Sequence, residues 1–233
     1  MIAERVAAVR ERIARAAERA SRPPADVTLV AVSKTHPAEA VRAAFTAGVR
    51  DFGENRVQEA EPKIAGTSDL AGARWHLVGH LQSNKVRRAA ALFGLVQSID
   101  SVEIAERLAR AAEESGREVR GLVEVDLAGE ATKYGLPEAE LLPALQALRG
   151  RAGLRLEGLM LLPPLLEDPE AVRPFFRRLR ALRDRALSEG LLAAGELSMG
   201  MSHDFEVAVE EGATMVRVGT ALFGARTRRA GKH

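Results

Sequence analysis

Short runs of apolar and β-branched residues alternate along the chain with longer segments whose apolar positions recur every three or four residues. The short runs predict eight strands, near Val27–Val32, Val49–Phe52, Trp75–Val78, Leu95–Ile99, Val119–Val125, Leu156–Leu161, Leu197–Met199 and Thr214–Val218. The longer segments predict helices over Ala38–Ala47, Arg56–Ile64, Lys85–Phe93, Val102–Glu114, Ala139–Leu148, Pro169–Leu187 and Phe205–Glu211. This alternation indicates parallel strands that are joined by helical crossovers.

Eight such units in 233 residues favour one closed (β/α)8 barrel, because a barrel of this class takes about 250 residues. An open doubly wound sheet is the structural alternative. We therefore expect one α/β domain over residues 1–225, followed by a basic, disordered tail over 226–233. Ile2, Val6, Val9 and Ile13 recur at helical spacing and predict an extra N-terminal helix that covers the bottom of the barrel.

Composition excludes several classes of function. The chain has no cysteine, which rules out disulfides, thiol nucleophiles and Cys-ligated metals and fits a reducing cytoplasm, where we place the protein. A net charge of only +2 does not point to nucleic acid. No apolar stretch is long enough to span a membrane, so no membrane partner is expected.

Lys34 is the first candidate for chemistry. Functional side chains of a (β/α)8 barrel gather where the strands end and the following loops begin. Lys34 comes two residues after the apolar run Leu29–Val32, which places it at this mouth. Partial desolvation there would favour the neutral amine, which can form an imine with a carbonyl compound. A solvated lysine at a strand end is the plainer interpretation of the position alone.

The last predicted strand supplies a second candidate. Alternation with a period of two places Met215, Arg217 and Gly219 on one face of this strand. If that face points inward, Arg217 needs a carboxylate, a phosphate or a cofactor nitrogen, because an unpaired buried guanidinium is costly. Gly219 and Thr220 then open a short helix whose free backbone N–H groups could bind a phosphate.

Two further loops carry small polar residues at the same mouth. Ser198 and Gly200 could approach an anion closely, and Ser202 could cap the next helix, although turn formation explains either loop alone. Asn55 could contact a ligand or cap the following helix, with capping slightly favoured. Polar residues of lower priority at the mouth are Gln82, Ser83, Asn84, Lys85, Lys133 and Tyr134. His76 and His80 lack a third clustered ligand, so no metal site is expected.

Seven motifs follow one another along the chain: Ala31–Lys34, Phe52–Arg56, Trp75–Lys85, Leu197–Ser202, Asp204–Glu206, Glu211–Thr220 and Phe223–Gly224. In this order they resemble the pyridoxal phosphate homeostasis proteins. That family is in turn similar to the barrel domain of alanine racemase. The resemblance covers nearly the whole chain, and it departs from the family pattern at His203, where an acidic residue is usual, and at Leu161 and Leu162, where a more polar residue is common.

The resemblance implies a set of site residues around pyridoxal 5′-phosphate (PLP). It implies that Lys34 holds PLP as a Schiff base, that Ser198, Gly219 and Thr220 hold the phosphate, and that Arg217 faces the pyridine nitrogen. The predicted cofactor-binding residues are Lys34, Asn55, Ser198, Met199, Arg217, Gly219 and Thr220. No catalytic residue is predicted, since an arginine at the ring nitrogen would weaken the ring as an electron sink. No metal-binding residue is predicted either.

The expected function is a PLP-binding protein of intracellular PLP homeostasis that carries or buffers the cofactor with little or no turnover. PLP-dependent apoenzymes are the expected partners, and a monomer and a weak homodimer are both open. One alternative is a racemase-like enzyme with Lys133 or Tyr134 as second base. A second is a cofactor-free aldolase that uses Lys34. A third is an interaction protein that binds through the basic tail.

Overall fold

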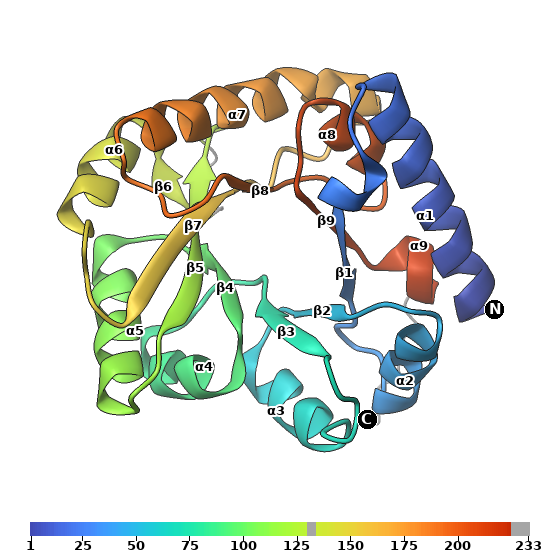
Figure 1. The fold of residues 1–233 in the computed structure, drawn as a ribbon, viewed down its shortest axis with the longest axis horizontal. Helices are drawn as coiled ribbons and strands as arrows, with labels where there is room; N and C mark the ends of the chain where they lie inside the picture. Colours follow the sequence, from blue (N-terminus) through green and yellow to red (C-terminus); the bar gives the residue numbers. More distant parts are fainter. Residues whose placement is uncertain (130–133, 225–233) are drawn as a thin grey trace, which may run out of the picture.

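The eight predicted strands form a closed parallel barrel with helices around it (Figure 1). The computed structural model describes residues 1–129 and 134–224, so Lys133 and the basic tail lie outside the described residues. The barrel strands are β1 (Thr28–Val32), β2 (Asp51–Glu54), β3 (Arg74–Leu77), β4 (Leu95–Ile99), β5 (Val119–Asp126), β7 (Leu154–Met160), β8 (Glu196–Ser198) and β9 (Met215–Val218). Pairing of β4 with β5 closes the sheet, and the two-residue strand β6 (Leu136–Pro137) pairs with β5 only.

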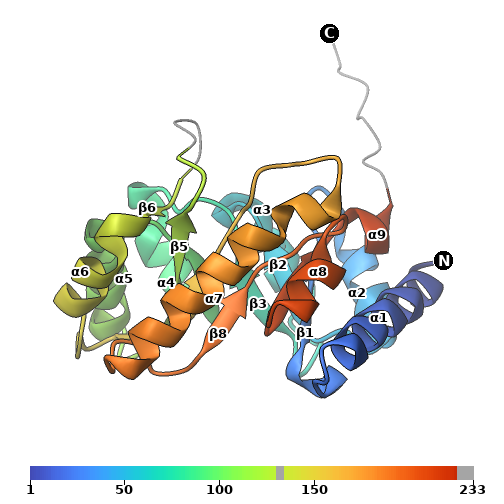
Figure 2. The ribbon, with the colours of Figure 1, turned by 90° about the horizontal axis from the view of Figure 1, so that it is seen from above.

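Helices follow the strands at the predicted places and surround the barrel (Figures 1 and 2). They are α1 (Ile2–Arg19), α2 (Ala38–Thr46), α3 (Val57–Ala65), α4 (Val86–Leu92), α5 (Val102–Glu114), α6 (Glu138–Ala147), α7 (Arg173–Ser188), α8 (Phe205–Glu210) and α9 (Thr220–Phe223). Short 3₁₀ helices are η1 (Pro24–Asp26), η2 (Ser83–Lys85) and η3 (Pro169–Val172). Among the described residues, none of these helices has the length and apolar character needed to cross a membrane.

Each strand packs one face outward against the helices and one face into the barrel. The larger hydrophobic cluster joins the outward faces to the helices. A smaller cluster contains residues from five strands, namely Val30, Leu95, Leu122, Met160 and Met215, and therefore fills the barrel interior. Several polar side chains are buried in the same interior, and they position the candidate site described below.

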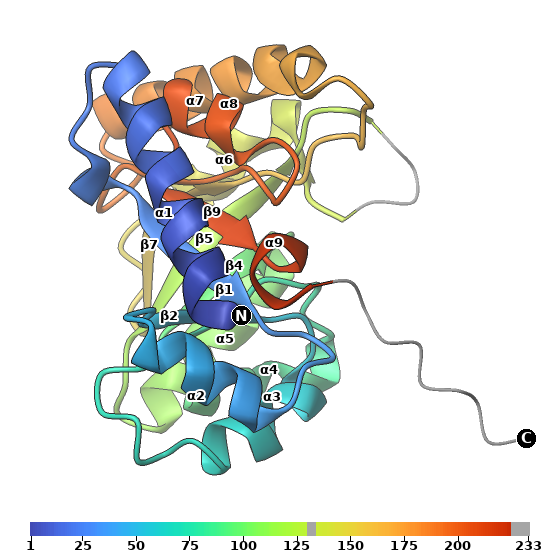
Figure 3. The same ribbon diagram turned by 90° about the vertical axis from the view of Figure 1, so that its right-hand side faces the viewer.

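The N-terminal helix α1 does not cover the bottom of the barrel, so this expectation was wrong. It lies along the outside, where it packs against α2, α8 and α9 (Figure 3). Its buried residues are Val6, Val9, Ile13, Ala16 and Ala17. The last strand, β9, is followed by only the four-residue helix α9, which leaves the outer face of β9 and β1 uncovered. The helix α1 fills this gap in the ring.

Candidate functional site

Lys34 lies just beyond β1, in a tight turn at the C-terminal mouth of the barrel. Thr35 adopts a left-handed backbone conformation, with φ of 67°, and the N–H of His36 donates to the carbonyl of Ser33 at 3.0 Å. The His36 ring packs against Phe223 of α9, with the ring centroids 5.0 Å apart. The turn that carries Lys34 is therefore held against the segment that follows β9.

A buried polar cluster on the outer side of the barrel wall anchors the residue before Lys34. The Ser33 hydroxyl donates to Glu54 Oε1 at 2.5 Å, and Lys63 Nζ donates to the same oxygen at 2.5 Å and to the Ser33 carbonyl at 2.8 Å. Burial raises the pKa of Glu54, although Lys63 and Ser33 oppose the rise. Lys63 is thus engaged behind the strand, whereas the half-buried Lys34 follows at the mouth.

Three predicted site residues come from adjoining strands. β1 pairs with β9 so that Val30 lies beside Arg217, and β1 pairs with β2 on its other side. Val30 belongs to the interior cluster, which places Arg217 on the inward face of β9. Lys34 is four residues after Val30, so the alternation of β1 assigns both to the same face. Asn55 directly follows the end of β2. Lys34, Arg217 and Asn55 therefore come from three adjoining strands of the barrel, β1, β9 and β2.

The Arg217 guanidinium is buried and makes two hydrogen bonds. Nη1 donates to Ser198 Oγ at 2.5 Å, and Nη2 donates to the carbonyl of Leu161 at 2.7 Å. Burial lowers its pKa to about 10, with the nearby charges of Glu124 and Asp204 opposing the shift. At neutral pH the group is still a cation. Because Leu161 contributes only its backbone oxygen, its departure from the family pattern leaves this contact in place.

Glu124 is a site feature that the sequence reasoning missed. It points into the barrel from β5 and is only 3% exposed. Burial raises its pKa to about 7, with Asp100 and Asp126 adding to the rise and Arg217 opposing it. A glutamate inside the apolar run of residues 122–125 was the available signal, because a charged residue at an inward strand position needs a reason.

The predicted phosphate corner is arranged differently from the expectation. The hydroxyl of Ser202 accepts hydrogen bonds from the backbone N–H groups of Gly219 and Ala221, each at 3.3 Å, so it lies at the start of α9. Its predicted capping of the next helix is wrong, because the N-cap of α8 is Asp204. The hydroxyl of Ser198 lies in the barrel interior, in contact with Arg217.

Four further residues that the sequence singled out lie in the same two loops. Thr220 is exposed as the first residue of α9, and a Cβ at Gly219 would come within 3.2 Å of the carbonyl of Val32. Met199 is buried in the outer cluster, so its side chain faces the helices. Gly200, with φ of 91°, turns the loop at a point where a Cβ would come within 2.5 Å of the Ala208 Cβ.

Asn55 lines a pocket of about 530 Å³ at the mouth rather than capping a helix. The predicted capping is wrong, because α3 has Arg56 as its N-cap and no side-chain cap. The lower-priority residues Gln82, Lys85 and Tyr134 line the same pocket, and so does His80. The rings of His80 and Tyr134 stack with centroids 3.6 Å apart, and His80 Nδ1 lies 2.8 Å from a carboxylate oxygen of Asp100.

The structure also shows the contacts of His203 and of the two histidines that were considered as metal ligands. The exposed His203 ring lies 3.0 Å from the carbonyl of Glu167, so it bridges two loops of the mouth. Within residues 1–129 and 134–224, no group of three or more His, Cys, Asp or Glu side chains is arranged to hold a metal ion. His76 and His80 contact different carboxylates, Asp51 and Asp100.

Comparison with known proteins defines the class of this barrel. Residues 5–227 match the family model described as "Alanine racemase, N-terminal domain". The "Pyridoxal phosphate homeostasis protein" of Aquifex aeolicus is 44% identical over 223 residues, which cover 96% of this chain and 97% of that one. The protein of the same name from Pseudomonas aeruginosa is 46% identical over 225 residues, with 97% and 96% covered.

A solved structure agrees with these relatives. PipY of Synechococcus elongatus, with PLP bound, is 43% identical and superposes with a TM-score of 0.85, covering 96% of this chain and 100% of that one. This chain belongs to the pyridoxal phosphate homeostasis proteins, within the alanine racemase N-terminal-domain family. The resemblance inferred from the seven motifs is therefore confirmed.

Proposed function

We propose that this protein binds PLP at the barrel mouth and acts in PLP homeostasis, carrying or buffering the cofactor with little or no turnover. Lys34 would hold PLP as a Schiff base. The observation that carries the proposal is the combination of Lys34, just beyond the mouth end of β1, with the buried, cationic Arg217 on the inward face of the neighbouring strand β9. The names of the relatives and the PLP-bound PipY structure support the choice of ligand.

The residues at the mouth fit this cofactor. An amine, a buried guanidinium and a set of backbone N–H groups match its aldehyde, its ring nitrogen and its phosphate. Lys34 supplies the amine, Arg217 faces the ring nitrogen, and Gly219, Thr220 and Ser202 at the start of α9 lie where the phosphate would bind. The other predicted residues are Asn55, Ser198 and Met199: Asn55 lines the mouth pocket, Ser198 contacts Arg217, and the Met199 side chain lies in the outer cluster.

Arg217 also explains why little turnover is expected. Bound PLP supplies an aldehyde that condenses with amines and a ring that withdraws electrons best when its nitrogen is protonated. A guanidinium that remains a cation up to a pKa of about 10 has only N–H donors to offer that nitrogen. Arg217 would therefore hold the nitrogen unprotonated and disfavour broad amino-acid chemistry.

We further propose that the protein works in the cytoplasm and supplies PLP-dependent apoenzymes, as a monomer or a weak homodimer. The racemase alternative needs a second base, and Tyr134, which is 55% exposed beside the mouth pocket, is the described candidate. Sustained racemisation of an amino acid by the wild type, lost in Lys34→Ala, would replace the carrier with this enzyme.

The deciding experiment is covalent mapping of the cofactor. The purified protein, incubated with PLP, should show an imine absorption band, and borohydride reduction should leave a pyridoxyl group on Lys34. Lys34→Ala should lose this adduct while retaining weaker, noncovalent binding, because the phosphate and ring contacts remain. Lys85→Ala, which changes another lysine of the mouth, should label like the wild type.

Two outcomes would overturn the assignment. Unchanged labelling of Lys34→Ala would move the imine to another lysine, first to Lys133. The absence of any imine band and any adduct in the wild type would sink the PLP proposal and favour a cofactor-free lysine enzyme.

A further inference from the structure

Gln97 carries a polar amide side chain that is buried inside the barrel. It is not among the predicted site residues, and strand formation does not require an amide at this position. It stands on β4, with the apolar Leu95 and Ile99 on the same strand, and it is fully buried. Its Oε1 accepts from the Ser198 hydroxyl at 2.6 Å, and its Nε2 lies 2.8 Å from His76 Nδ1. Both partners come from other strands, so Gln97 joins β3, β4 and β8 across the interior.

These contacts belong to a continuous chain of hydrogen bonds through the barrel. At the mouth, Arg217 donates to Ser198 at 2.5 Å. At the opposite end, His76 Nε2 lies 3.0 Å from Asp51 Oδ1, and Arg74 donates to both oxygens of that carboxylate. The chain therefore runs from a guanidinium at the mouth to a carboxylate near the N-terminal ends of the strands.

With a neutral His76, the two ends of this hydrogen-bond chain fix the direction of every hydrogen bond in it. Arg217 can only donate, so the Ser198 oxygen accepts from it and gives its own proton to Gln97 Oε1. The amide Nε2 then donates to His76 Nδ1, which must carry no proton. His76 holds its proton on Nε2 and donates it to Asp51, which can only accept when ionised.

The reversed amide orientation is inconsistent with a neutral histidine. With Nε2 of Gln97 towards Ser198, that hydroxyl would receive two donors and lose its acceptor. Oε1 would then need a proton on His76 Nδ1, while Asp51 still needs one on Nε2, so His76 would have to be a cation. The orientation in the structure satisfies all five side chains with a neutral imidazole.

We propose that Gln97 is a positioning residue that, through Ser198, orients the Arg217 guanidinium at the mouth and holds His76 as the neutral tautomer protonated on Nε2. The cofactor part of this inference rests on the proposed function. The Ser198 hydroxyl accepts from Arg217 and donates to Gln97, so its role in this proposal is to hold Arg217. Gln97 itself touches no ligand and acts only through Ser198 and Arg217.

The first test needs no cofactor. In the ¹⁵N NMR spectrum of the unliganded protein, His76 should show a protonated Nε2 and an unprotonated Nδ1 at neutral pH. Gln97→Leu should shift the side-chain ¹⁵N signals of Arg217, although the two side chains are not in direct contact. A proton on Nδ1 of His76, or an unmoved Arg217, would overturn the inference whether or not the protein binds PLP.

The second test uses PLP titrations followed by imine absorption. Gln97→Leu and Ser198→Ala should each weaken retention about tenfold, the effect of one lost hydrogen bond to a charged group. Because both variants break the same link, the double variant should be no weaker than either single variant. Multiplicative losses in the double variant would contradict a shared pathway.

A neighbouring residue separates positioning from general damage to β4. The Ser98 hydroxyl donates to the carbonyl of Gly79 at 2.7 Å, outside the chain. Ser98→Ala loses this hydrogen bond from the same strand but leaves the contacts of Gln97 intact. The Arg217 signals and the retention of PLP should therefore remain as in the wild type. Equal effects of Ser98→Ala and Gln97→Leu would reduce Gln97 to a packing role. A wild type that binds no PLP would refute the proposed function. The NMR experiment would still test whether Gln97 orients Arg217 and fixes the tautomer of His76.

Discussion

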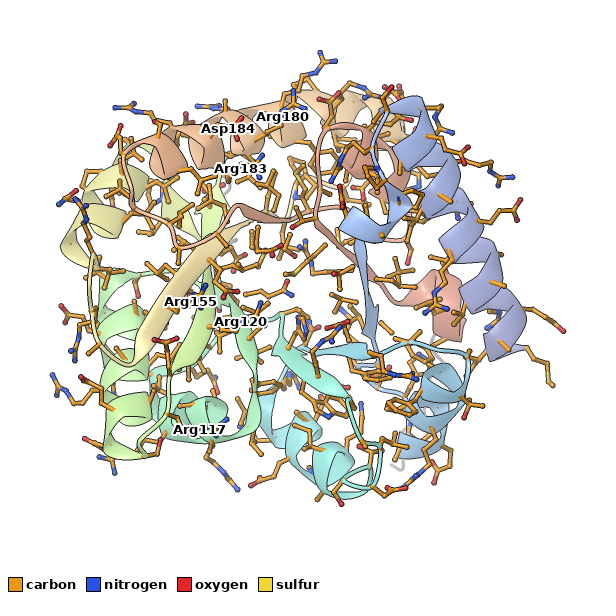
Figure 4. The ribbon with its side chains drawn as sticks, in the orientation of Figure 1. Arg117, Arg120, Arg155, Arg180, Arg183 and Asp184 are labelled. Atoms are coloured by element: carbon orange, nitrogen blue, oxygen red, sulfur yellow. The ribbon has the colours of Figure 1, made fainter. Side chains whose placement is uncertain are left out.

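The two ends of the barrel interior contain similar charged groups that are used in different ways. At the N-terminal end, Arg74 donates to both oxygens of Asp51, and Arg120 and Arg155 flank Glu157. Figure 4 shows Arg120 and Arg155 at the beginnings of β5 and β7, where their residues pair in register. Burial alone would raise the pKa of Asp51, but hydrogen bonds from His76 and Arg74 lower it to about 2.

At the mouth, the buried cation and the buried acid do not satisfy one another. Among residues 1–129 and 134–224, neither Arg217 nor Glu124 forms an ion pair. Their pKa values move towards neutrality, to about 10 and about 7, because burial is the largest cause in each case. The N-terminal end thus pairs its buried carboxylates with arginines, whereas the mouth holds a buried cation and a buried acid that form no such pair.

The largest expected effect is on the pH dependence of unfolding. The Glu124 pKa of about 7 lies above its ordinary 4.5, so the folded state holds a proton that the unfolded chain releases. This contribution is complete below pH 4.5 and is lost as pH rises through 7, which costs about 3 kcal/mol. Glu124→Gln should remove this loss, as read from urea unfolding of the cofactor-free protein at pH 5 and pH 8.

The exposed Glu106 of α5 provides the matched control. Glu106→Gln should keep the pH dependence of the wild type. Parallel pH profiles for Glu124→Gln and wild type would mean that Glu124 is paired, and the contrast between the two ends would disappear.

The opposite sign is expected at the N-terminal end. Asp51 has a pKa of about 2 in the folded protein against an ordinary 3.8, so its contribution is present above pH 4 and is lost as pH falls towards 2. Asp51→Asn should therefore lower the free energy of unfolding by about 2 kcal/mol at pH 7. The difference from wild type should shrink at pH 3. Asp69→Asn breaks an exposed pair with Arg42 and should show no such change.

The sequence was sufficient for the barrel and for its most informative residues. Strand and helix positions followed from apolar periodicity, because each parallel strand is buried on both faces while each helix is buried on one. Lys34 and Arg217 were found because side chains at strand ends face the mouth whatever the details of packing. The position of α1 was not predictable, since it depended on the shortness of α9.

The hydrogen-bond chain lay beyond sequence reasoning. Gln97, His76 and Ser198 are far apart along the chain, and their contacts depend on the register and stagger of β3, β4 and β8. Ser198 and Ser202 look equivalent as small polar loop residues. The left-handed turn at Gly200 separates them, so one lies in the interior and the other at the start of α9. Only the polar residues inside apolar strands signalled that the interior had a second role.

The smallest expected effect concerns Arg217 itself. Arg217→Met loses two hydrogen bonds but also removes the desolvation cost of a buried cation that has no ion-pair partner among the described residues, and the two effects oppose one another. The cofactor-free variant should therefore unfold within about 1 kcal/mol of wild type, while its retention of PLP falls. Arg74→Met, at the other end, leaves the buried Asp51 without its double contact and should cost more stability. A larger loss of unfolding free energy for Arg217→Met than for Arg74→Met would mean that Arg217 stabilises the core. The charged groups at the two ends of the barrel would then have the same structural role.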